Sequence, residues 1–217
     1  VIIWSSTIFI MLSREEQQYI LSLTEEFLPS VLEEINFDPN DGKKEKGHRS
    51  GEDLETTLVQ KFRKRDKIRF TEPTADRAMA DFLFNNNKIN IKFSCVKRGQ
   101  PNMCAWDRLY KKFYDGEIDS YWILMINGLT QEVCFFNLYE HLDYTNTDLG
   151  TGQTMLTKAR FVEYFNQDKD YTIQNKDDIL DKLDWIDEDA LERMERAKRK
   201  KFNQRKELRN DRNKVLQ

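Results

Sequence analysis

The sequence is poor in the residues that build disulfide frameworks and common metal centres. Its 217 residues include three cysteines and two histidines. No two cysteines have the spacing of metal ligands, and an odd count argues against a disulfide framework. A reducing environment, and hence a cytoplasmic location, fits this cysteine usage best. Neither histidine has an evident partner in the sequence, which argues against a zinc site and a Ser-His-Asp triad.

The chain also lacks an apolar run long enough to cross a membrane. Its first twelve residues, VIIWSSTIFIML, are mostly apolar but too few to span a bilayer. They have neither the basic start nor the small-residue cleavage site of a signal peptide. Because the polar segment SREEQQ follows at once, we expect Met11 to be a natural start and the ten residues before it an extension. The alternative is a short buried strand or helix.

Net charge is nearly absent from the whole chain but not from its C-terminal part. The formal net charge is −3, yet from Arg193 to Gln217 eleven Lys and Arg stand against three acids, a net +8 that leaves −11 elsewhere. Such asymmetry indicates a nucleic-acid contact or, alternatively, a solvated helix that is simply basic. With 39% hydrophobic and 34% charged residues, we expect a soluble chain with one real hydrophobic core.

The N-terminal third is expected to hold two helices joined by a loop. Ser13 and Glu16 have the spacing of a capping box, and apolar residues follow at helical spacing. Pro29 is expected to break or restart this helix. Residues 38–51 are polar and glycine-rich and predict an exposed, mobile loop. A second helix is expected from Glu52, with Leu54, Leu58 and Phe62 on one side.

The middle of the chain predicts a sheet with one helix inserted. We expect a short strand within 67–72, a strand beginning near Met79, a hairpin turn at 85–87, and an alternating strand at 88–96. A helix should cover 102–116 and end at Gly116. Strands at 120–127 and 132–140 follow. Beyond them come a polar loop at 150–156 and charged helices after 175, without internal repeats or convincing apolar heptads.

Two charged residues, Asp81 and Lys92, stand on segments that otherwise predict strands. If those strands pair through the asparagine turn, Asp81 lies near Asn90 and Lys92 across the ladder. An acid from the helix at Glu52 would complete a cluster of carboxylates, an amide oxygen and an ammonium group. Oxygen ligands of this kind suit Mg²⁺, which stabilises charge on a phosphate and activates water. The alternative is that Lys92 belongs to a solvated face and Asp81 to a strand end.

Residues 52–140 resemble the PD-(D/E)xK nuclease superfamily in the order of these motifs. The resemblance is carried by GEDLETTL on the helix, ADFLF at the second strand and NIK on the third, followed by a helix and a strand. It covers about 90 of the 217 residues. It implies an α/β fold with a restriction-endonuclease-like core, in which a central mixed sheet is flanked by helices, with additional N- and C-terminal helices. Within the superfamily, type II restriction endonucleases resemble the chain most in size.

The resemblance also implies the catalytic residues. They are Glu55 or Glu52 on the helix, Asp81, Asn90 and Lys92, with Asp81, Asn90 and Glu55 as Mg²⁺ ligands. Glu55 is preferred because it lies one turn inside the helix, and Asp76 is an alternative to Asp81. Asn90 departs from the family pattern, which has Asp or Glu at that position. A neutral amide there leaves room for an inactive relative that only binds DNA.

The implied activity is Mg²⁺-dependent, sequence-specific hydrolysis of double-stranded DNA by a type II restriction enzyme of a restriction-modification system. The alternative enzyme is a repair or phage nuclease of the same fold. A homodimer would match a palindromic target, and no membrane partner is expected. We expect an N-terminal extension, helix and loop at 1–51, a nuclease core at 52–142 and a DNA-contacting region at 143–217. The expected DNA contacts are Lys43, Lys44, Arg49, Lys97, Arg98, Gln153, Lys198 and Arg199.

Overall fold

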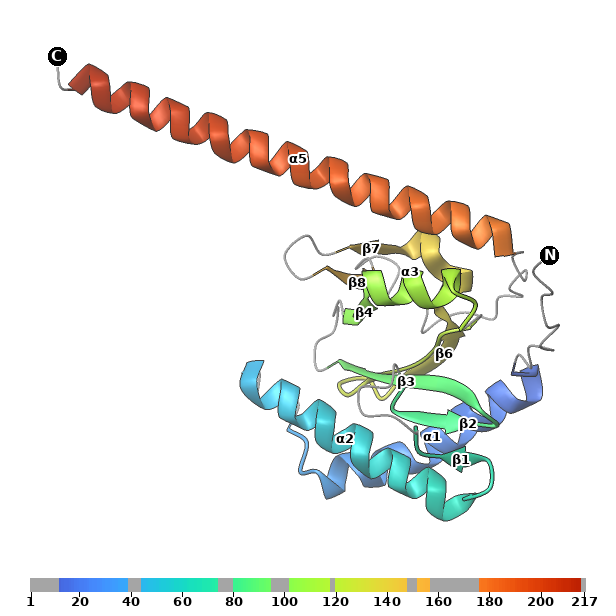
Figure 1. Ribbon diagram of the computed structural model, residues 1–217. Helices are drawn as coiled ribbons and strands as arrows, with labels where there is room; N and C mark the ends of the chain where they lie inside the picture. The colour runs from blue at the N-terminus through green and yellow to red at the C-terminus, as the bar shows by residue number, and fades with distance from the viewer. Residues whose placement is uncertain are drawn as a thin grey trace, which may run out of the picture.

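The protein is an α/β fold in which a mixed central sheet is flanked by helices, as expected (Figure 1). The computed structural model describes residues 12–38, 44–73, 80–94, 102–117, 120–147, 152–156 and 176–215. The helices are α1 (Arg14–Glu34), α2 (Lys44–Arg65), α3 (Trp106–Tyr114), the 3₁₀ segment η1 (Leu138–Tyr144) and α5 (Lys176–Val215). The strands are β1 (Phe70–Thr71), β2 (Phe82–Phe84), β3 (Asn87–Ser94), β4 (Asn102–Ala105), β5 (Trp122–Asn127), β6 (Val133–Asn137), β7 (Thr145–Thr147) and β8 (Gln153–Leu156).

The central sheet has the order β1-β2-β3-β5-β6. Its neighbours pair antiparallel except β3 and β5, which run parallel. A parallel pair needs a crossover connection, and here β4 and α3 lie in that crossover. β4 joins β8 and β7 in a second, three-stranded sheet. This small sheet and α3 lie on one side of the central sheet, while α1 and α2 lie on the other (Figure 1).

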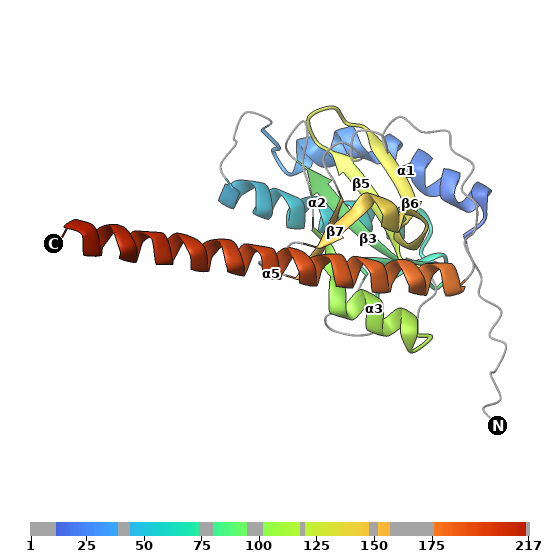
Figure 2. The same cartoon turned by 90° about the horizontal axis from the view of Figure 1, so that it is seen from above.

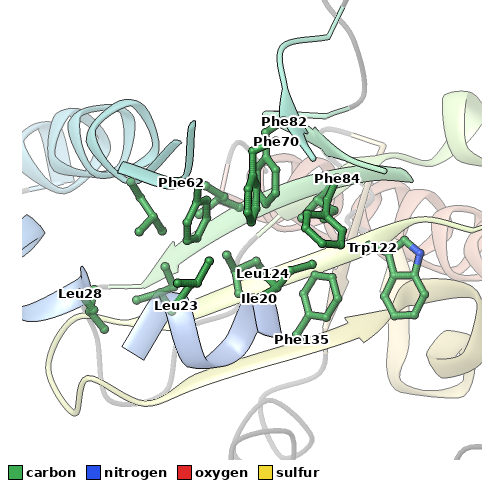
Figure 3. Close-up of a cluster of buried hydrophobic side chains, with 14 of the residues drawn as sticks. Ile20, Leu23, Leu28, Phe62, Phe70, Phe82, Phe84, Trp122, Leu124 and Phe135 are labelled. Atoms are coloured by element: carbon green, nitrogen blue, oxygen red, sulfur yellow. The ribbon is translucent and has the colours of Figure 1, made fainter. Parts of the chain in front are cut away.

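The core on the α1–α2 side is built largely from aromatic rings. Phe62 of α2 stacks on Phe70 of β1 with ring centroids 4.9 Å apart, and Phe70 lies 4.8 Å from Phe84 of β2. Figure 3 shows these rings between the helices and the strands, with Trp122 and Phe135 continuing the cluster along β5 and β6. Burial of this many large apolar side chains fixes α2 against the hairpin of β2 and β3.

Several local predictions are confirmed. Ser13 caps α1, and Glu16 completes the capping box. The asparagine turn is present, with φ of 47° at Asn85 and 67° at Asn86, and it joins β2 to β3. Gly116 follows the end of α3 with φ of 70°, the left-handed conformation that favours glycine.

Three local predictions are wrong. Helix α1 continues through Pro29, because both Pro29 and Glu25, whose carbonyl loses its helical partner there, face solvent. Helix α2 begins at Lys44, so residues 44–51 are helical rather than a loop, and the expected boundary between 51 and 52 falls inside a helix. Residues 102–105 and 153–156 form β4 and β8 instead of a helix start and a polar loop, because each segment supplies the other's backbone hydrogen bonds.

The last helix, α5, leaves the body of the protein. Its first half packs against η1 and β7 and buries Ile179, Leu183, Ile186 and Ala190. The C-terminal end of the helix projects past every other described element in both views (Figures 1 and 2). Among the described residues, no helix is both long enough and apolar enough to cross a bilayer.

Candidate active site

The alternation of β3 places two polar side chains on the sheet face opposite α2. Ile89 and Ile91 belong to the core under α1 and α2. Asn90 and Lys92 point to the other face, where their neighbours on β5 are Ile123 and Met125. The sequence therefore puts an amide and an ammonium group side by side on the most buried part of the sheet.

Asp81 lies directly before β2 and completes the edge of β3. Its N–H donates to the carbonyl of Ile89 at 2.8 Å, beside the last paired position of the hairpin, Phe82 with Ile89. Its Oδ2 accepts a hydrogen bond from the N–H of Ile91 at 2.6 Å. The side chain thus takes the place of a backbone acceptor at the point where the pairing of β3 with β2 has ended. This hydrogen bond fixes one carboxylate oxygen of Asp81 against the edge of β3.

Helix α2 brings Glu55 to the same place. Leu54 and Leu58 are buried under the sheet, so Glu55 beside them comes to the rim of the strands. Burial raises the pKa of the Glu55 carboxyl from 4.5 to about 7; the negative charge of Asp81 adds to this, Lys92 opposes it, and Glu52 adds to it. These interactions place Glu55, Asp81 and Lys92 within electrostatic range of one another. The structure thereby brings together Glu55 and Lys92, which are 37 positions apart in the sequence.

The pKa of Asp81 is also raised. Burial is the main cause, while the hydrogen bond from Ile91 and the positive charge of Lys92 act against it. A cation bound between these two carboxyl groups would favour their ionised forms, as the positive charge of Lys92 already does in part.

Asn90 adds an unsatisfied acceptor. Its side chain is 9% exposed, and its Oδ1 has no hydrogen-bond partner within the described part of the chain. A buried amide oxygen without a partner costs free energy and calls for an explanation. An oxygen ligand for a cation would explain it, so the residues present fit a Mg²⁺ ion in part: two carboxylates and one neutral oxygen. Within the described ranges, no group of three or more His, Cys, Asp or Glu side chains could hold a metal.

A cavity of about 420 Å³ opens beside this cluster. Glu55 and Asp81 line it together with Gln60, Arg63 and Glu72, and Arg63 and Glu72 form an ion pair there. Sequence analysis does not identify Gln60, Arg63 or Glu72. The available signal is helical spacing, since Arg63 lies eight residues, or about two turns, after Glu55.

The structure separates the two candidate glutamates. Glu55 lines the cavity, whereas Glu52 is exposed and not part of its wall. Asp76, the alternative to Asp81, lies outside the described residues, as do Lys43, Lys97 and Arg98 among the expected DNA contacts.

Among the other expected DNA contacts, those whose side chains are described do not line the cavity. Gln153 lies on β8 opposite Ala105, and Lys198 and Arg199 are exposed on the projecting half of α5. Lys44 and Arg49 lie in the first turns of α2. A comparison of the sequence with protein-family models found no match, and neither did a comparison with curated proteins.

Proposed function

We propose that this protein is a Mg²⁺-dependent endonuclease that hydrolyses phosphodiester bonds in double-stranded DNA, of the type II restriction class. One observation carries the proposal: Glu55 on α2 and Asp81 before β2 line one open cavity, and Lys92 on β3 lies within electrostatic range of both carboxylates. Along the chain, α2 is followed by β1, β2 and β3 of the central sheet, then by β4 of the small sheet, α3 and the parallel strand β5, and this order supports a restriction-endonuclease-like core.

Each residue has a distinct part in this proposal. Asp81, Glu55 and the Oδ1 of Asn90 would hold Mg²⁺, which when bound supplies Lewis-acid stabilisation of phosphate charge and makes water more acidic. Lys92 places a positive charge beside both carboxylates and can stabilise the negative charge that builds up on the phosphate. Without the ion, burial raises the pKa of Glu55 to about 7, and a cation bound beside it would favour its ionised form.

The phosphate contacts of the DNA come from surfaces outside the cavity. Basic residues dominate such contacts, because phosphate binding supplies most of the affinity. Among the described residues, Arg199 is exposed and basic. Lys44 and Arg49 at the start of α2 are further candidates, and Gln153 a possible backbone or base contact.

The test is incubation of plasmid DNA with Mg²⁺, followed by sequencing of the cleaved ends. We expect discrete fragments, and expect Lys92→Ala to lower the cleavage rate at least 100-fold while DNA retention in a gel-shift assay changes little. Lys88→Ala is the matched control, because Lys88 lies on the same face of β3, four residues earlier and away from the cluster. Full cleavage by Lys92→Ala would contradict the assignment of the site.

A second candidate function is DNA binding without cleavage. Asn90 favours it, because a neutral oxygen at this position leaves the cation site with two carboxylates. DNA retention without cuts, with either Mg²⁺ or Mn²⁺, would support this candidate. Cleavage at many positions, without discrete fragments, would instead indicate a general nuclease of the same fold.

A further inference from the structure

The projecting helix α5 carries a continuous exposed stripe along one side. Its members follow one another at alternating steps of three and four residues, the spacing that keeps side chains on one face of a helix and defines a coiled-coil seam. All of them are exposed, including the large apolar residues Leu191 (55%) and Phe202 (68%). The stripe consists of Glu188, Leu191, Glu195, Lys198, Phe202 and Arg205.

The body of the protein does not cover this stripe. The buried residues Leu183, Ile186 and Ala190 hold the first half of α5 against the body from a different face of the helix. Arg193 and Met194 are still partly covered, and the C-terminal end of the helix extends past the other described elements in both views (Figures 1 and 2). Two large apolar side chains on a projecting helix therefore have no partner within the described chain, which is the situation of an interaction surface.

The charges of the stripe are segregated along the helix. Its acids, Glu188 and Glu195, come first, and its bases, Lys198 and Arg205, come last. The two apolar residues occupy equivalent places, Leu191 between the acids and Phe202 between the bases. When two copies of the stripe lie antiparallel, the acids of each copy therefore face the bases of the other, and the apolar residues face each other.

We infer that two copies of this protein associate through the α5 stripe in an antiparallel, two-fold arrangement. Leu191 packs on Phe202 of the second copy, Glu195 meets its Lys198, and Glu188 meets its Arg205. Two-fold symmetry repeats each contact, because residue i contacts j wherever j contacts i. The inference rests on α5 alone and does not depend on the proposed nuclease activity.

The order of charged and apolar residues in the stripe favours an antiparallel second copy over a parallel copy, a shifted register or a nucleic acid. A parallel pair would set acid against acid and base against base, which is unfavourable. A shift of one heptad in either direction would separate Leu191 from Phe202 and oppose each to a charged residue. A nucleic acid would engage Lys198 and Arg205 but would leave Leu191 and Phe202 exposed and bring phosphates toward Glu188 and Glu195. Only the antiparallel register satisfies all six positions.

The seam also has properties that bear on its strength. Exposed ion pairs are individually weak and are screened by salt. Glu195 additionally lies 3.9 Å from Arg199 on its own helix, which competes with the contact to the second copy. We therefore expect a dissociation constant in the micromolar range that weakens as salt is raised. Asp184, which accepts a hydrogen bond from the Tyr110 hydroxyl at 2.7 Å, marks the end of the seam nearest the body.

Sedimentation velocity of the full chain, without DNA and at low salt, tests the association. We expect a monomer–dimer equilibrium that Lys198→Glu weakens at least tenfold. Lys200→Glu is the matched control, since it changes the charge equally but lies two residues further, on the opposite side of the helix. A monomer at all concentrations, equal effects of the two variants, or association only when duplex DNA is added would each overturn the inference.

A mixing experiment tests the register itself. Glu188→Lys with Glu195→Lys makes an all-basic stripe, and Lys198→Glu with Arg205→Glu makes an all-acidic one. Each double variant alone should sediment as a monomer, whereas an equimolar mixture should form a one-to-one dimer. Because all four positions are exposed, circular dichroism should show unchanged helix content. A mixture that stays monomeric, while the wild-type chain dimerises, would rule out this pairing.

Discussion

At the scale of single residues, the candidate site owes its character to burial of charge. Glu55 and Asp81 both have pKa values raised chiefly by burial, and Lys92 opposes the rise in each. Asp81 also stabilises the edge of β3, because its Oδ2 accepts a hydrogen bond from the N–H of Ile91. The free energy of keeping Glu55 at the rim of the sheet therefore depends on pH.

Glu55→Gln should change how stability depends on pH. In the wild-type protein the folded pKa of about 7 lies above the usual 4.5, so this group's stabilisation is complete below 4.5 and is lost as pH rises through 7. The glutamine variant cannot lose a proton. In the absence of divalent cations, we expect the free energy of unfolding of the variant, relative to that of wild type, to rise by about 1–3 kcal/mol between pH 5 and pH 8.

Urea unfolding at the two pH values, without divalent cations, measures this difference. Glu52→Gln is the control, because Glu52 is exposed one turn earlier on α2, and its stability difference from wild type should stay nearly constant. Parallel pH dependence in Glu55→Gln and wild type would show that Glu55 is not held in a buried, charge-disfavouring position.

At the scale of secondary-structure elements, two glycines differ in the room that their surroundings leave for a side chain. Gly128 ends the hairpin strand β5, and its N–H donates to the carbonyl of Ser94 at 2.9 Å. A Cβ at this position would lie 2.5 Å from Cζ of Phe93 and 2.9 Å from Cζ of Phe37. Gly51 lies inside α2, and a Cβ there would meet nothing within 4 Å.

Opposite effects are expected when each glycine is replaced by alanine. Gly128→Ala should lower the free energy of unfolding by about 1–3 kcal/mol, because the rings of Phe93 and Phe37 must move out of their packed positions. Gly51→Ala should raise it by about 0.5–1 kcal/mol, because alanine loses less backbone freedom in a helix. Chemical denaturation of the two variants measures both values, and equal signs would refute the packing described around Gly128.

At the same scale, elements defined by local contacts were predictable and those defined by distant pairing were not. The capping box at Ser13, the asparagine turn and the alternation of β3 depend on residues close in sequence, and the structure confirms each. β4 and β8 were missed because each exists through pairing with a segment about 50 residues away. Neither segment has a strong strand pattern by itself.

At the scale of the whole molecule, α5 divides into a half supported by the body and a half supported by its own side chains. The first half buries four apolar residues, whereas the second shows only exposed or partly exposed side chains where they are described. Ion pairs one turn apart, such as Arg196 with Glu192 at 3.9 Å, contribute a few tenths of a kcal/mol each. Most helical stability in proteins comes from tertiary packing, so we expect this half to open more readily than the first.

Hydrogen exchange should reveal this division. In dilute protein, we expect backbone amides at 200–215 to exchange at least tenfold faster than those at 179–190, because the latter open only when the helix leaves the body. As the protein concentration rises, protection should increase within 188–205 if the second copy binds there. Mass spectrometry of peptic fragments at two concentrations measures both effects. Equal exchange along all of α5 in dilute protein would contradict the division.

The sequence by itself determined the local elements, the basic end of the chain and the candidate polar residues, because these follow from neighbours within a few positions. Only the tertiary structure decided that Glu55 rather than Glu52 lines the cavity, and that Asn90 has an unsatisfied buried oxygen. The first depends on how α2 packs against the sheet, and the second on the opposite face of the same sheet. The packing of α5 against η1 and β7, segments distant in sequence, decides how much of that helix the body supports.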